Sequence, residues 1–83
     1  METPSSDAVA LNTLLPGEKG RVLGTRSLSP AVFRLIELGL TPGTQVEMVR
    51  RAPLGGPLQI RVRRARLCLR RPDAACFFIE RLS

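Results

Sequence analysis

The chain has 83 residues, 43% of them hydrophobic, and a net charge of +6 that comes from twelve arginines and one lysine against seven acidic residues. This length is enough for one domain with one thin core, and no apolar run is long enough to cross a bilayer. There is no histidine, and the only cysteines are Cys68 and Cys76. Zinc-type metal sites use several Cys or His ligands, and acid–base catalysis near neutral pH most often uses histidine. We therefore expect no metal ion, no cofactor and no enzymatic activity.

The excess of arginine favours an anionic partner, which is nucleic acid, an acidic protein surface or a membrane surface. The alternative is a solvated basic surface without a dedicated partner. Residues 1–10 lack the basic and apolar regions of a signal peptide, so we expect a cytoplasmic protein. Because these residues are polar and include proline, serine and aspartate, we expect a flexible N-terminal tail, followed by a single domain at residues 11–83.

The first predicted elements are a short strand and a helix. Two apolar anchors, Leu11 and Leu14, precede a strand at residues 20–23. Ser29 and Pro30 are typical of the first positions of a helix, and Gly39 is typical of the residue that ends one. The apolar residues at helical spacing between them are Val32, Leu35, Ile36 and Leu38.

From residue 45 onward the apolar residues alternate with polar ones, which predicts strands. A compact Pro-Gly-rich connection at residues 53–57 separates the first of these strands from the clearest one, at residues 58–62, where one face is apolar and the other basic. Two more strands follow, at residues 66–70 and near residues 77–79. The economical arrangement is mainly β: a small barrel of about five to six strands with one short α-helix.

Four segments in this order resemble the FeoA family. RLIELGLTPGT at residues 34–44 is similar to the family's RLxELGLxPGT, and APLGGPL at residues 52–58 is similar to its APLGxPL loop. LCLRR at residues 67–71 and LLPGEKGRV at residues 14–22 also match family segments. The resemblance implies an SH3-like barrel, similar to the C-terminal domain of iron regulators of the diphtheria-toxin-repressor type. It also implies an accessory protein of bacterial ferrous iron uptake that contacts the cytoplasmic G-protein-like part of the membrane transporter FeoB.

The chain departs from the family in two places. Arg64 stands where the family has glycine in the hairpin after the central strand, and arginine does not tolerate a positive φ at low cost. We therefore expect this hairpin to be longer or of another type. Residues 29–33 also replace the family's polar lead into the helix, which alters the surface of that helix.

The candidate contact residues lie in three places. In the Pro-Gly-rich loop, Leu54 is an apolar residue at an exposed tip, between glycines and prolines that shape the loop. The alternative is that Leu54 folds back onto the barrel. Together with the exposed part of the helix and the basic strand face, the candidates are Leu54, Gly55, Gly56, Arg34, Glu37, Arg61 and Arg63.

Three modes of action are compatible with these residues. The first is contact with FeoB, which would recruit the protein to the inner face of the cell membrane through the transporter alone. The second is a small basic barrel that binds nucleic acid, which the absence of Tyr and Trp disfavours because such barrels stack bases on aromatic residues. The third is self-association as a homodimer, with Leu54 or a strand edge at the interface.

Overall fold

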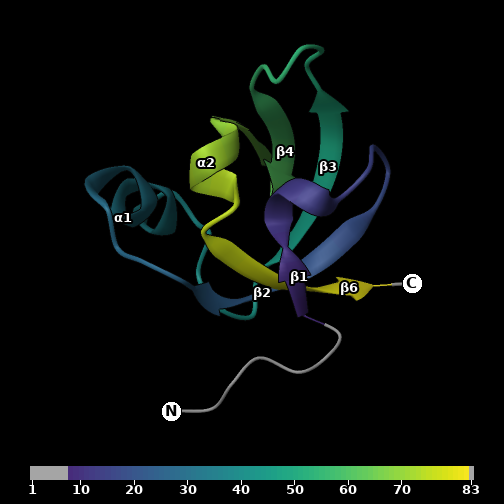
Figure 1. Ribbon diagram of the computed structural model, residues 1–83. Helices are drawn as coiled ribbons and strands as arrows, with labels where there is room; N and C mark the ends of the chain where they lie inside the picture. The colour runs from purple at the N-terminus through teal and green to yellow at the C-terminus, as the bar shows by residue number, and fades with distance from the viewer. Residues whose placement is uncertain (1–7, 83) are drawn as a thin grey trace.

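The structure is a computed structural model that describes residues 8–82 (Figure 1). Six antiparallel strands form one sheet in the order β1-β6-β2-β3-β4-β5. The strands are β1 (Ala8–Ala10), β2 (Lys19–Thr25), β3 (Gln45–Arg51), β4 (Leu58–Val62), β5 (Ala65–Leu69) and β6 (Phe77–Leu82). The helical segments are the 3-10 helix η1 (Leu11–Thr13), α1 (Pro30–Glu37) and the single-turn α2 (Arg71–Ala74). The expected mainly β fold with one short α-helix is confirmed.

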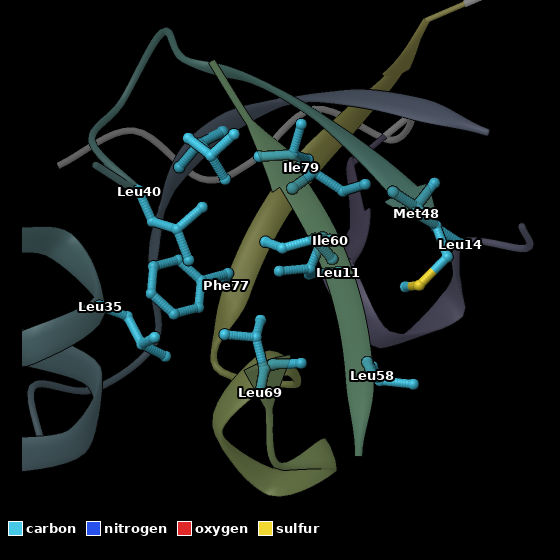
Figure 2. Close-up of a cluster of buried hydrophobic side chains, with 14 of the residues drawn as sticks. Leu11, Leu14, Leu35, Leu40, Met48, Leu58, Ile60, Leu69, Phe77 and Ile79 are labelled. Atoms are coloured by element: carbon cyan, nitrogen blue, oxygen red, sulfur yellow. The ribbon is translucent and has the colours of Figure 1, made fainter. Parts of the chain in front are cut away.

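The sheet curls around one apolar core. Alternation along β4 buries Leu58, Ile60 and Val62 and leaves Arg61 exposed, as the sequence predicts. Figure 2 shows the side chains that meet inside, with Phe77 of β6 near Leu40 and Leu35. The fully enclosed large residues come from η1, from α1, from strands β2 to β6 and from the connections. The two end strands, β1 and β5, pair with neighbours on one side only.

Helix α1 begins and ends where the sequence predicts. The Ser29 hydroxyl accepts a hydrogen bond from the Val32 amide at 3.2 Å, which satisfies a donor at the start of the helix. Gly39 has a φ of 128°, a value open to glycine but rarely to other residues. Val32 and Leu35 are buried against the core. Leu38, expected on the same apolar face, is instead half exposed, because it lies at the C-terminal cap and the chain turns there toward Leu40.

The structure differs from the expected flexible tail at residues 8–10. They form strand β1, which pairs with β6 through Ala8–Glu80, Val9–Ile79 and Ala10–Phe78. Three residues with small side chains carry little periodic signal, and the strand exists because β6 offers an unpaired edge. The rest of the expected tail, residues 1–7, lies outside the described residues.

The hairpin between β4 and β5 was expected to be longer or of another type, and the structure corrects the first of these alternatives. Val62 pairs directly with Ala65, so the loop contains only Arg63 and Arg64 and is no longer than usual. Arg63 has a φ of 57°, whereas Arg64 has no positive φ. A positive φ at the first loop residue alone matches a type II′ turn, in which glycine is the usual residue. The expected extra length is therefore wrong, Arg64 does not adopt a positive φ, and the left-handed residue of this turn is Arg63.

Candidate protein-interaction surface

The β3–β4 loop presents a leucine to solvent. Leu54 is 104% exposed and has a φ of 58°, a left-handed value that is uncommon for any residue other than glycine, asparagine or aspartate. Gly55 follows with a φ of 75°. The loop projects away from the barrel beyond the ends of β3 and β4 (Figure 1). Leu54 does not fold back onto the core, so this part of the sequence interpretation is confirmed in its geometry.

The loop is held in one shape by its own backbone. The Ala52 amide donates to the Pro57 carbonyl at 3.0 Å, and the Gly56 amide donates to the Pro53 carbonyl at 3.1 Å. A Cβ atom at Gly56 would lie 2.8 Å from the Cβ of Ala52, so only glycine fits there without movement. Two prolines further restrict the loop by limiting φ. The turn is thus compact and leaves little conformational freedom to its tip.

A single arginine from α2 ties the loop to the rest of the molecule. The Nε of Arg71 donates to the Gly56 carbonyl at 2.9 Å, and its Nη2 donates to the Ala52 carbonyl at 2.9 Å. The planar guanidinium suits such a two-point contact. Sequence reasoning did not predict this contact. Nothing in the local pattern signals it, because the two partners are 15 and 19 residues away.

The other candidates lie apart from the loop. Arg34 and Glu37 are exposed on α1, which sits at the side of the barrel in Figure 1, away from the β3–β4 loop. Arg61 and Arg63 lie at the far end of β4, next to the β4–β5 hairpin. The structure therefore joins Leu54 with Gly55 and Gly56 but does not gather the seven candidates into one site.

Exposed apolar residues around α1 were not among the candidates. Leu28 is 66% exposed and Phe33 53% exposed. On a helix, Phe33 and the half-exposed Leu38 fall on opposite flanks of the buried stripe, with Arg34 and Glu37 between them. Phe33 and Leu38 therefore do not form one continuous patch, and single exposed apolar residues are common on protein surfaces.

The arginine-bearing face has no aromatic platform. The three phenylalanines lie elsewhere: Phe33 on α1, Phe77 in the core and Phe78 on β6. The guanidinium carbon of Arg26 lies over the Phe78 ring, 5.4 Å from the ring centroid. Arg51 also serves the fold, because its Nη1 donates to the carbonyls of Asn12 and Leu14 at 2.6 and 2.8 Å. Base stacking of the kind that single-strand-binding barrels use has no counterpart on this face.

Metal ligation has little support within residues 8–82. They contain no group of three or more His, Cys, Asp or Glu side chains positioned to hold a metal ion. Both cysteines are free: Cys68 is exposed on β5, and Cys76 lies half buried before β6, where its thiol lies 3.4 Å from the Pro72 carbonyl. Across the same residues, no helix combines the length and apolarity that a membrane crossing requires.

Comparison with known proteins decides the family. The model of the FeoA domain matches residues 9–81. The chain belongs to the FeoA family. A FeoA-like protein from Clostridium acetobutylicum has 27% identity and a TM-score of 0.83, over 94% of this chain and 91% of that one. FeoA from Stenotrophomonas maltophilia, solved with zinc, has 30% identity and a TM-score of 0.76, over 87% of this chain and 89% of that one.

The S. maltophilia protein is described as a prokaryotic SH3 domain protein and as a candidate activating factor of bacterial ferrous iron transport. The TM-score to that protein shows that this FeoA-family chain shares its SH3-like fold. IdeR from T. acidophilum, only 16% identical, has a TM-score of 0.82 over 99% of this chain and 37% of that one. That match concerns the fold alone, and it confirms the expected likeness to a domain of metal-dependent repressors.

Proposed function

We propose that this FeoA-family chain assists ferrous iron uptake by binding the cytoplasmic G-protein-like part of the transporter FeoB, with the Leu54 loop as the principal contact. The observation that carries the proposal is a fully exposed leucine in left-handed backbone, on a loop that Arg71 ties to the barrel. Family membership supports the iron-transport context. The protein would act in the cytoplasm, at the inner face of the membrane, where binding to the transporter alone recruits it.

The energetics of the loop favour a contact role. An exposed leucine contributes nothing to the core, and left-handed backbone costs a residue with a side chain about 1–2 kcal/mol. Burial of such a side chain in a partner's apolar pocket would return about 1.5–3 kcal/mol. Because the loop is already ordered, binding would lose little conformational entropy. Sites that break a local rule of folding in this way are often functional.

The action on the partner would be non-catalytic. A bound protein can shift the conformational or nucleotide equilibrium of its partner only as far as its affinities for the two states differ. Preferential binding of the Leu54 loop to one state of the G-protein-like part would supply that difference. The direction of the shift, toward activation or inhibition of transport, follows from which state binds more tightly.

A capture experiment from native membranes tests this proposal. Wild-type protein, Leu54→Asp and the control Leu28→Asp would each be used as bait, with captured proteins identified by mass spectrometry. Leu28 is also an exposed leucine, but it lies before α1. We expect wild type and Leu28→Asp to capture FeoB and Leu54→Asp to lose it. Equal capture by all three would refute the loop as the contact, and failure of wild type to capture FeoB would refute the partner.

The same samples address the two alternatives. Size-exclusion chromatography with light scattering would report a dimer, and a dimer lost in Leu54→Asp would assign the loop to self-association instead. Nucleic acid captured by wild type, with an affinity that falls steeply as salt rises, would favour the basic-barrel alternative.

A further inference from the structure

An open groove with a volume of ≈ 590 Å³ lies beside the end of β4. One wall is the connection from α1 into β3, residues 41–47, and the other consists of Arg61 and Arg63. The loop that carries Leu54 precedes the first residue of β4, whereas the groove adjoins its last residues. At about 3.3 Å per residue, the two features are separated by about 13 Å of strand. The groove is therefore a different surface from the Leu54 loop.

Positive charge is concentrated at this groove. Arg61 of β4 stands directly opposite Arg66 of β5 on the outward face. Because Val62 and Ala65 flank a two-residue loop as a hydrogen-bonded pair, the next pair, Arg61 with Arg66, is of the close, non-hydrogen-bonded kind. Like charges that face each other in this way destabilise a sheet. Arg63 and Arg64 add two more cations in the loop between them.

The fold neutralises little of this charge. The carboxylate of Glu47 lies 3.6 Å from Arg61 Nη1, and both side chains are partly exposed. Within residues 8–82, the other three arginines of this cluster have no acidic side chain within 4.0 Å. An exposed pair such as Glu47–Arg61 contributes little to stability, so an incoming carboxylate could replace Glu47 at small cost. An anion bound between Arg61 and Arg66 would relieve this unfavourable pair.

The remaining wall of the groove can donate a hydrogen bond but offers no stacking surface. The hydroxyl oxygens of Thr41 and Thr44 lie 2.9 Å apart, so one donates to the other and the second keeps a free proton. The amides of Gly43 and Thr44 already donate to the carbonyls of Val22 and Thr41, which keeps this turn in place. No aromatic residue lines the groove.

We propose that this groove binds a carboxylate-rich peptide segment, with Arg61 and Arg63 of its lining and the neighbouring Arg66, which pairs with Arg61, as the cations that recognise it. Guanidinium groups bind carboxylates through paired hydrogen bonds, and the free threonine hydroxyl adds a third donor. A peptide is favoured over a bilayer because the turn at Thr41–Thr44 walls one side of the cations, and a flat surface reaches a groove poorly. It is favoured over nucleic acid because the lining has no ring for base stacking. The inference does not depend on which protein carries the segment.

A defined probe tests the groove without any transporter. Fluorescently labelled hexaglutamate would be titrated with the protein at two salt concentrations, and hexaglutamine would serve as the uncharged peptide. The variants are Arg63→Gln and Arg66→Gln, and the control is Arg34→Gln, which removes the same charge from an exposed position on α1. We expect each groove variant to weaken hexaglutamate binding about fivefold and Arg34→Gln to weaken it less than about twofold.

Amide chemical shifts locate the bound peptide independently of mutation. Addition of hexaglutamate to wild type should move the signals of residues 41–47 and of the β4–β5 hairpin, and hexaglutamine should move none. An equal loss of affinity in Arg34→Gln, or shifts spread over the whole surface, would overturn the proposal in favour of a general charge effect. Tighter binding of hexathymidylate or of anionic phosphatidylserine vesicles through the same arginines would overturn it in favour of those ligands.

Discussion

Arg71 donates to the Gly56 carbonyl at 2.9 Å and thereby joins α2 to the loop that presents Leu54. The same guanidinium reaches Ala52 on the other side of the loop, so one side chain bridges both arms of the turn. The loop's own backbone hydrogen bonds are thus supplemented by a residue that contributes neither to the core nor to the exposed contact surface. This arrangement separates the residue that holds the loop from the residue that the loop displays.

Replacement of Arg71 should loosen the loop. Arg71→Gln removes two charge-assisted hydrogen bonds to partly buried carbonyls, and we expect a loss of about 2 kcal/mol in the free energy of unfolding. Arg71→Lys should lose nearly as much, because a lysine ammonium does not match the planar two-point geometry. Urea denaturation measures the loss. The exposed neighbour Arg70 provides the control, and a comparable loss in Arg70→Gln would show that charge alone, rather than the loop contact, is responsible.

Leu54→Asn should stabilise the protein while it abolishes partner binding. Asparagine tolerates left-handed backbone better than leucine, and the fully exposed leucine has no packing to lose. We expect a gain of about 0.5–1 kcal/mol in the free energy of unfolding. Leu54→Ala keeps the backbone strain and should show no such gain. If Leu54→Asn is less stable than wild type, the side chain makes contacts in solution that contradict its exposed position.

Two glycines of β2 should respond to alanine in opposite ways. A Cβ at Gly20 would lie 2.6 Å from Ile79 Cδ1 and 3.3 Å from the Glu80 carbonyl oxygen, whereas a Cβ at Gly24 would have no atom within 4 Å. We expect Gly20→Ala to cost about 1–3 kcal/mol by overpacking the core around Ile79. Gly24→Ala should be neutral or stabilise by about 0.5 kcal/mol, since alanine restricts the unfolded chain. Thermal unfolding of the matched pair decides this, and equal melting temperatures would contradict the close β2–β6 packing.

The hydrogen bond from the Val32 amide to the Ser29 hydroxyl, which caps α1, should contribute measurably to stability. Ser29→Ala leaves the Val32 amide without its partner, and we expect a loss of about 1 kcal/mol in the free energy of unfolding. Because α1 buries Val32 and Leu35, amide hydrogen exchange should also quicken along this helix. Ser27→Ala is the control, since the exposed Ser27 hydroxyl makes a single long hydrogen bond, of 3.5 Å, to the Cys76 sulfur. Unchanged exchange in Ser29→Ala would show that tertiary packing alone holds the helix.

The sequence predicts those parts of the fold in which neighbouring residues carry the signal. Alternation along residues 58–62 predicts β4, and the Ser29-Pro30 start with Gly39 at the end predicts α1, because each pattern reflects one element and one buried face. The prolines and glycines of residues 53–57 predict the turn between β3 and β4 in the same way, but the structure decides that Leu54 at its tip is exposed.

The remaining features depend on residues that are distant in sequence. Strand β1 forms because β6 has a free edge, the hairpin loop places its left-handed residue at Arg63 because Val62 pairs with Ala65, and Arg71 reaches a loop 15 residues earlier. The sequence by itself determined the family and the alternation along the later strands, because local chemistry encodes both, but it left open whether Leu54 is exposed or folds back onto the barrel. Only the tertiary structure decided which arginine holds the loop and which arginines face one another beside the groove, because strand pairing brings those side chains together.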